Sequence, residues 1–213
     1  MLLSDEQRRS LVTKSQKYRD ELKSTENRHA LDYLTNRGLT PETISRFGLG
    51  YVGTPEPGDQ FYKGRLAIPY ISKCPVKGTT VTTITFRALQ ESNKKYLKYP
   101  GHHDRIYNPG ALLLDTDYIC ICEGEIDCIS ASQAGIAAIG VPGVNAWAPW
   151  MRRAVKGYKT VYILQDNDEA GEQFTKKLAE TVRNVKAIPM VDGDVNATLV
   201  SKGEEYLREQ IGL

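Results

Sequence analysis

Residues 160–171 read TVYILQDNDEAG, an apolar, β-branched run followed at once by two aspartates and a glycine. Residues 118–124, YICICEG, repeat this arrangement with a glutamate. Ligands of open α/β sheets collect at the carboxyl ends of the strands, so Glu123, Asp166 and Asp168 should lie along one rim. Asp166 and Asp168 are two residues apart, which points both side chains the same way in extended backbone. We therefore expect one acidic cluster.

Carboxylates this close repel one another, and each shifts towards protonation unless a cation lies between them. Their oxygens favour Mg²⁺ or Mn²⁺, hard ions that keep positions open for water and phosphate oxygens. Such ions neutralise a triphosphate, so phosphoryl transfer is the predicted reaction class. Taken singly, Asp168 also fits a helix N-cap, and we interpret Asp117, Glu125 and Asp192 as cap or turn carboxylates.

The residues around these two strands alternate between strand and helix patterns. Strands are predicted at residues 118–122, 136–141, 160–165 and 187–191, and helices from about 127, at 147–155, around 174–185 and at 204–211. This alternation predicts a compact α/β lobe with a mostly parallel sheet and flanking helices.

The first half of the chain predicts helices followed by strands. Ser4 and Gln7 are spaced as in a capping box, and apolar residues recur at helical spacing over residues 5–23. Two shorter helices are expected through residues 30–34, before Gly38, and from Pro41 to Phe47. These helices form a small entry unit.

Antiparallel strands are expected next, at residues 66–71 and 81–89, with a break at Pro75 and Gly78. The predicted architecture is therefore α/β overall, with a smaller mixed α+β lobe preceding the α/β lobe. We place the N-terminal lobe at residues 1–115, with a helical entry (1–50) and a basic β region (59–115), and the metal-binding lobe at 116–213. The boundary is expected at Asp115 to Asp117.

Charge divides along the same boundary. Residues 1–115 hold 18 Lys and Arg against 12 Asp and Glu, whereas residues 116–213 hold 10 against 14. A basic lobe suits phosphates and an acidic lobe suits cations.

The cysteines and the absence of a long apolar run indicate a reducing cytoplasmic setting with no membrane contact. Cys120, Cys122 and Cys128 have no second pair of Cys or His at zinc-site spacing, so no zinc site is expected in this chain.

The acidic stretches resemble the motifs of the TOPRIM fold, which primases, topoisomerases and some nucleases share. Residues 123–127, EGEID, resemble its glutamate motif, and residues 166–171, DNDEAG, resemble its Asp-x-Asp motif. Residues 193–196, GDVN, resemble its later acidic element without the usual preceding lysine. The resemblance implies that Glu123, Asp166 and Asp168 are catalytic metal ligands, and that Asp127 and Asp194 support the site or hold a second ion.

Residues 30–51, ALDYLTNRGLTPETISRFGLGY, resemble the element that precedes the catalytic sheet in bacterial and phage DNA primases. Residues 64–69, 84–89 and 95–97 resemble the strands and basic motif that follow in that family, and residues 106–108 its Leu-Tyr-Asn turn.

The primase resemblance implies a cleft that faces the metal ions and binds template or nucleotide phosphates. Its expected lining is Arg65, Arg87, Lys95 and Tyr96, with Lys98, where the family usually has Asn, as a further candidate. The alternative for any one of these cations is a solvated surface.

Primase membership implies template-directed synthesis of RNA primers on single-stranded DNA from ribonucleoside triphosphates, a nucleotidyl transfer by a DNA-directed RNA polymerase. The chain has no Gly-x-x-x-x-Gly-Lys-Ser/Thr loop, so a separate replicative helicase is expected as partner. The family's zinc-binding module would have to come from another chain, and a phage origin would place the protein in the host cytoplasm. Two alternatives are a TOPRIM nuclease and a non-catalytic nucleic-acid-binding accessory protein.

Overall fold

A computed structural model of the chain describes residues 3–74, 78–101, 103, 105–143 and 146–213. Its first helix, α1 (Asp5–Lys23), begins at the predicted capping box. The Ser4 hydroxyl accepts a hydrogen bond from the Gln7 backbone N–H (3.1 Å), and the Gln7 side chain accepts one from the Ser4 backbone (2.8 Å). The buried residues of α1 recur every three or four positions: Leu11, Ser15, Tyr18 and Leu22.

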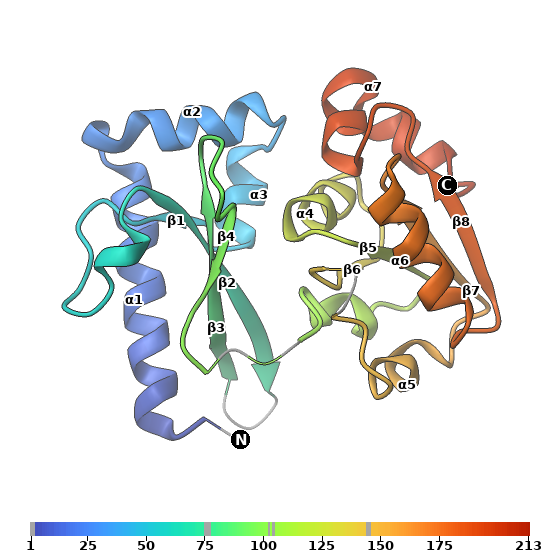
Figure 1. Cartoon of the computed structure of the whole chain (residues 1–213), viewed down its shortest axis with the longest axis horizontal. Coiled ribbons are helices and arrows are strands. Elements are labelled where there is room, and N and C mark those ends of the chain that lie inside the picture. Colours follow the sequence, from blue (N-terminus) through green and yellow to red (C-terminus); the bar gives the residue numbers. More distant parts are fainter. Residues whose placement is uncertain (1–2, 75–77, 102, 104, 144–145) are drawn as a thin grey trace. The chain divides into compact units, whose positions relative to one another are not determined.

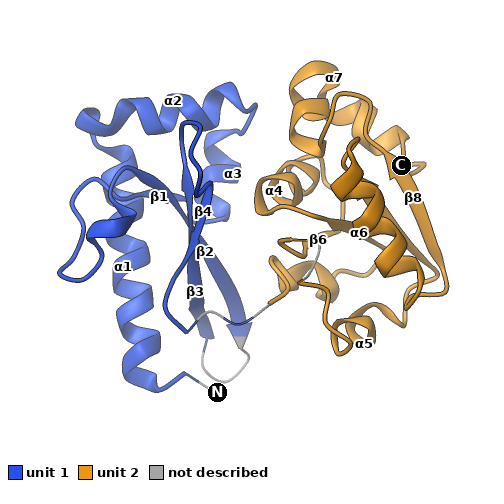
Figure 2. Ribbon diagram, in the orientation of Figure 1, with its two compact units in different colours: residues 1–103 blue, residues 104–213 orange. Residues whose placement is uncertain are grey.

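The chain divides into two compact units, residues 1–103 and 104–213 (Figure 2). Unit 1 continues with η1 (Thr25–Asn27), α2 (Arg28–Asn36), α3 (Pro41–Arg46), β1 (Gly50–Tyr51), η2 (Gln60–Tyr62), β2 (Arg65–Cys74), β3 (Gly78–Ala88) and β4 (Tyr96–Lys98) (Figure 1). The four strands pair antiparallel in the order β1-β2-β3-β4, which confirms the predicted antiparallel region. Pro75, at the expected break, lies outside the described residues.

The core of unit 1 lies between α1 and one face of this sheet. Tyr18 meets Phe86 edge-on, and the Tyr62 ring stacks on the Phe86 ring with the two ring centroids 3.8 Å apart. Tyr18 and Phe86 are both fully buried. The apolar ring surface that these two side chains remove from water holds α1 against the sheet.

Unit 2 contains η3 (Pro109–Leu113), β5 (Tyr118–Cys122), α4 (Glu125–Gln133), β6 (Ala138–Gly140), α5 (Met151–Val155), β7 (Thr160–Gln165), α6 (Glu169–Ala179), β8 (Val185–Pro189) and α7 (Val195–Glu209). The strands form a fully parallel sheet in the order β6-β5-β7-β8. The predicted α/β lobe with a parallel sheet is confirmed.

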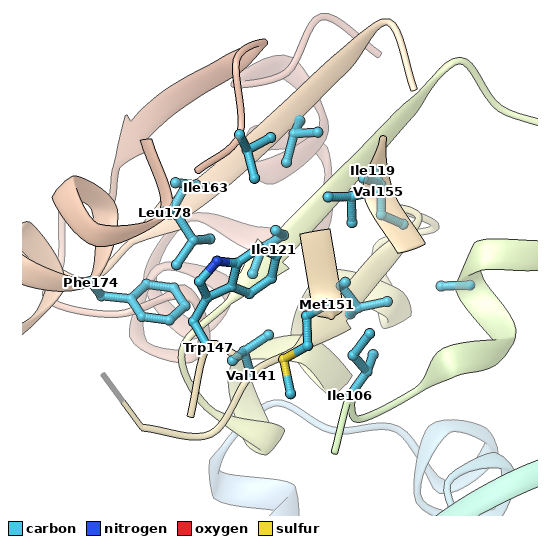
Figure 3. Close-up of a cluster of buried hydrophobic side chains, with 14 of the residues drawn as sticks. Ile106, Ile119, Ile121, Val141, Trp147, Met151, Val155, Ile163, Phe174 and Leu178 are labelled. Carbon is cyan, nitrogen blue, oxygen red and sulfur yellow. The ribbon is translucent and has the colours of Figure 1, made fainter. Parts of the chain in front are cut away.

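A continuous apolar cluster fills unit 2 (Figure 3). The Trp147 ring lies beside Phe174 and Leu178 of α6 in this cluster, and its indole N–H donates to the Thr181 hydroxyl at 2.9 Å. The strand residues Ile121 and Ile163 complete the contact from the sheet, so α6 is held on the sheet next to the acidic turn that precedes it.

Element boundaries differ from the sequence predictions most clearly in three helices. Helix α6 begins and ends earlier than the predicted range of about 174–185, and Val185 instead begins β8. The helix expected from Trp147 begins only at Met151, because Pro149 disfavours helical backbone in the residue before it. The last helix begins at Val195, well before the expected Glu204. Asp194 caps this earlier start, and Gly203, with a φ of 86°, kinks the helix where a beginning was predicted.

The division between the units falls before the predicted boundary at residues 115–117. Tyr107 forms an antiparallel bridge with Gly140, with backbone N–H···O distances of 2.8 and 3.1 Å. Residues from 105 onward therefore belong to the second unit. Within the described part of the chain, no helix combines the length and apolar character needed to cross a membrane.

Candidate metal centre

Two acidic turns follow neighbouring strands. Parallel strands β5 and β7 pair with Cys122 opposite Leu164, and Glu123 and Asp166 come just after these strands end. The parallel pairing carries both carboxylates to the same rim of the sheet, as the residue pattern predicted.

Glycines allow the helices after these turns to approach closely. A Cβ atom at Gly171 would lie 2.2 Å from the Asp166 carbonyl oxygen, and one at Gly124 would lie 2.4 Å from Asp127 Oδ2. Neither position tolerates a side chain without movement of the acidic residue beside it. The glycines therefore let α6 and α4 begin directly against the carboxylate turns.

Asp168 and Asp194 each cap a helix. Asp168 Oδ1 accepts from the Gly171 N–H at 2.8 Å, and Asp194 Oδ1 accepts from the Ala197 N–H at 2.6 Å. The N-cap interpretation of Asp168 thus describes its local contact. Each cap uses one carboxylate oxygen, so capping and metal binding are compatible roles.

The α4 carboxylates are more buried than turn residues usually are. Asp127 is 8% exposed, and its Oδ1 accepts from the Asn196 backbone N–H at 3.1 Å. Glu125, which its place in the sequence predicts to be a cap or turn carboxylate, lies in the first turn of α4 and is only 2% exposed. Asp117, by contrast, makes an exposed ion pair with Lys159 at 2.9 Å.

The carboxylates share a strong repulsive field. Burial raises the pKa of Asp166 to about 8, with further contributions from four negative neighbours: Asp127, Asp194, Glu123 and Asp168. Burial, followed by the charge of Asp168, also raises the pKa of Glu123. All five carboxylates singled out in the sequence therefore lie close enough to influence the same site.

Two oxygens in this field are buried without a hydrogen-bond partner among the described residues: Glu123 Oε2 and Asp166 Oδ1. Such orphaned acceptors are costly unless something electropositive reaches them. No three acidic, His or Cys side chains of the described segments already converge on one point that would hold a metal ion. The oxygen donors and the repulsion between them nevertheless fit a divalent cation, which would require the carboxylates to rotate inward.

The nearby cysteines behave as core residues. Cys120, Cys122 and Cys128 are free and buried, and burial raises the pKa of each thiol far above its usual range. The Cys128 thiol lies 3.4 Å from the Ala138 carbonyl oxygen, to which it donates. All three side chains are completely buried, so these positions contribute packing.

In unit 1, Arg87 is held by two tyrosines. Its Nε donates to the Tyr33 hydroxyl at 2.9 Å, and its Nη1 donates to the Tyr96 hydroxyl. The register pairs Arg87 with Tyr96 and Thr85 with Lys98, which places Tyr96 and Lys98 on the same face as Arg87.

Arg65 and Lys95 lie elsewhere on the sheet. Arg65 is opposite Ala88, so strand alternation puts it on the other face from Arg87. Its Nη1 donates to the carbonyl oxygens of Lys94 (2.8 Å) and Lys95 (3.4 Å), at the end of the β3–β4 hairpin. Arg87, Tyr96 and Lys98 therefore share one sheet face and Arg65 lies on the other, whereas the Lys95 ammonium, at the hairpin end, lies 6.0 Å from the centroid of the Tyr96 ring.

A groove of about 690 Å³ beside Arg65 was not predicted. Helix α2 supplies His29 and Tyr33 to its wall, and His29 Nε2 lies 3.0 Å from the Tyr51 hydroxyl. Residues 29, 33 and 36 are spaced to share one face of a helix, which was the available sequence signal for this groove. Polar residues at that spacing are common on solvent-facing helix surfaces, so the spacing alone did not indicate a groove.

Two family models match the chain. The Toprim-like family matches residues 120–199, and the family described as DNA primase catalytic core, N-terminal domain, matches residues 17–67. The first match contains all five carboxylates of the acidic cluster, and the second runs from the last part of α1 to the start of β2.

Relatives match over most of the chain. The gene 57 protein of Mycobacterium phage D29 is 42% identical over 151 residues, which cover 70% of this chain and 99% of the phage protein. The DNA primase of Thermotoga maritima is 24% identical over 87% of this chain, and the chain spans only 40% of that primase. Among solved structures, the RNA polymerase domain of Mycobacterium tuberculosis primase DnaG in complex with double-stranded DNA aligns with a TM-score of 0.74 and 18% identity, covering 95% of this chain and 78% of that one.

Proposed function

The chain belongs to the family of DNA primase catalytic cores, and we propose that it synthesises short RNA primers on single-stranded DNA. The observation that carries the proposal is the acidic rim of unit 2, where Glu123 Oε2 and Asp166 Oδ1 are buried without partners. This rim occurs in the same chain as the matched primase N-terminal domain. A polymerase of this class needs such a rim to handle the phosphates of ribonucleoside triphosphates.

We assign Glu123, Asp166 and Asp168 as the residues that hold Mg²⁺ or Mn²⁺, with Asp127 and Asp194 supporting the site or a second ion. The ions would supply charge neutralisation for a triphosphate and for the pyrophosphate that departs. The protein's own contribution is to gather these carboxylates on one partly buried rim, where they repel one another until a cation binds between them. The nucleotide 3′-hydroxyl then attacks the α-phosphate of the incoming nucleotide.

The nucleic acid is proposed to contact unit 1. On the sheet face, Arg87 and Lys98 would meet phosphates while the Tyr96 ring provides a stacking or hydrogen-bonding surface. The Tyr33 and Tyr96 hydroxyls fix the Arg87 guanidinium, so its direction is set before binding. Arg65 and Lys95 would contact the strand at the hairpin end.

Other replication proteins are proposed as partners. Unwinding requires ATP hydrolysis, for which the sequence carries no phosphate-binding loop, so a replicative helicase would supply single-stranded template. A separate zinc-binding module is proposed to select the template sequence. Both would act where DNA is replicated, in the cytoplasm of the cell or of a phage host.

A primer-synthesis assay tests the proposal. The protein is incubated with single-stranded DNA, labelled ribonucleotides and Mg²⁺ or Mn²⁺, beside the Glu123→Gln variant. New short labelled oligomers that disappear in the variant are the expected result. Shortened DNA instead of new oligomers would identify a nuclease, and DNA binding with neither product would identify a non-catalytic accessory protein.

A further inference from the structure

The N-terminal turns of α4 and α7 meet beside the acidic rim. The two helices pack against each other within unit 2 (Figure 1). Each helix begins at a carboxylate of the cluster: Asp127 lies in the first turn of α4, and Asp194 is the N-cap of α7. The relative position of these turns therefore sets how closely the two carboxylates approach.

Asn196 joins the two turns through two hydrogen bonds. Its backbone N–H donates to Asp127 Oδ1 at 3.1 Å, and its side-chain amide donates to the Ser130 hydroxyl at 2.9 Å. The Ser130 hydroxyl in turn donates to the Ile126 carbonyl at 2.9 Å, so its orientation is set by α4 itself. Asn196 is 3% exposed and Ser130 is fully buried, which shields these bonds from competing water.

The Asp127 carboxylate also lies against the glycine turn that directly follows Glu123. Its Oδ1 accepts from the Asn196 backbone N–H, and its Oδ2 lies 2.4 Å from the position that a Gly124 Cβ would occupy. A displacement of Asp127 would therefore also press on the turn that carries Glu123.

We propose that Asn196 and Ser130 are a positioning pair that sets the affinity of the acidic rim for its divalent ion by fixing Asp127 and Asp194 relative to each other. Neither Asn196 nor Ser130 is among the residues proposed to hold the ion. The inference rests on the proposed function in assigning the rim to a metal ion. Partners that orient metal ligands typically change metal affinity by about 10–100-fold when they are removed.

The test is Mn²⁺ binding, measured by the loss of the free-ion electron paramagnetic resonance signal, for the full chain and three variants. Ser130→Ala removes the hydroxyl that receives the Asn196 amide, and Asn196→Ala removes the amide. Ser132→Ala is the matched control, because Ser132 lies on the same helix, is also buried, and accepts from Asn108 at 3.2 Å. We expect about 10-fold weaker Mn²⁺ binding for Ser130→Ala and Asn196→Ala and unchanged binding for Ser132→Ala.

Unfolding midpoints separate positioning from stability. All binding is measured well below the lowest midpoint, where every variant is folded, and primer synthesis by Ser130→Ala should recover as Mn²⁺ is raised. Equal Mn²⁺ affinity in Ser130→Ala and Ser132→Ala overturns the positioning role, as does wild-type protein that binds no Mn²⁺. The wild type could bind Mn²⁺ but make no primers, while Ser130→Ala and Asn196→Ala bind Mn²⁺ more weakly than it does. That outcome would support the positioning pair and refute primer synthesis.

Discussion

Among the acidic residues, Asp166 is the one at which the requirements of stable folding and of cation binding differ most. Its Oδ1 is buried without a partner among the described residues, and burial together with four neighbouring carboxylates raises its pKa to about 8. A residue selected for stability alone would not occupy this position, because a neutral side chain would cost less. Its charge is useful only when a cation is present.

The first prediction concerns pH in the absence of metal. Because the pKa of Asp166 is higher in the folded protein than its ordinary value near 4, the folded state binds more protons between about pH 4 and pH 8. Stability in EDTA should therefore fall as pH rises through this window. Asp166→Asn should flatten the decline, unfold at a higher temperature at pH 8 and lose Mn²⁺ binding.

Thermal unfolding in EDTA at several pH values measures this directly, and Asp117→Asn is the control because that carboxyl is exposed and paired with Lys159. The same downward slope in wild type and Asp166→Asn would show that the carboxyl is not the source. A less stable Asp166→Asn would mean that the aspartate has a structural role.

Helix starts, rather than strands, control the spacing of the acidic cluster. Strands β5 and β7 bring Glu123 and Asp166 to one rim. Helices α6 and α4 can approach this rim only because Gly171 lies in the first turn of α6 and Gly124 directly precedes α4. The Asp168 cap then secures the start of α6. The carboxylates are thus held by local features of the helices that follow them.

Gly171→Ala should consequently disturb the site through α6. The new Cβ would lie 2.2 Å from the Asp166 carbonyl, a backbone atom that cannot rotate away, so the first turn must move. We expect a loss of about 1–3 kcal/mol in the free energy of unfolding, together with weaker Mn²⁺ binding. Urea unfolding and Mn²⁺ titration give the two quantities.

Gly157→Ala provides the comparison for that experiment. A Cβ at Gly157 meets nothing within 4 Å, so this variant changes a glycine of the same unit without steric conflict. If Gly157→Ala and Gly171→Ala were equally stable, the close approach of α6 to Asp166 would not be a constraint.

Across the whole molecule, charge is distributed to suit a polyanionic substrate and its metal ions. The N-terminal half carries the excess of Lys and Arg, and the other half carries the excess of Asp and Glu. The basic side chains do not act alike, because Arg87 is buried and bonded to two tyrosines whereas Lys95 is exposed. An exposed lysine can release a counterion on binding DNA without any rearrangement of the fold.

Lys95→Ala should therefore weaken binding to single-stranded DNA and reduce its salt dependence while leaving stability unchanged. Each lost phosphate contact lowers the slope of log affinity against log salt by about 0.7 for single strands. Fluorescence anisotropy at several salt concentrations measures the slope. Lys23→Ala, at the exposed end of α1, should bind as wild type does, and an equal loss in both variants would argue against a specific contact.

Local patterns in the chain were sufficient for most of the longer helices and strands, the order of the acidic turns and the cap at Ser4, but not for the starts of α6 and α7. They depend on residues a few positions apart, whose spacing directly sets helix or strand geometry. The contacts that orient the site could not be read this way. Asp127 meets Asn196 across 69 residues, and Arg87 meets Tyr33 across 54. Such pairs form only when packing of helices and strands brings distant segments together, so they depend on tertiary structure.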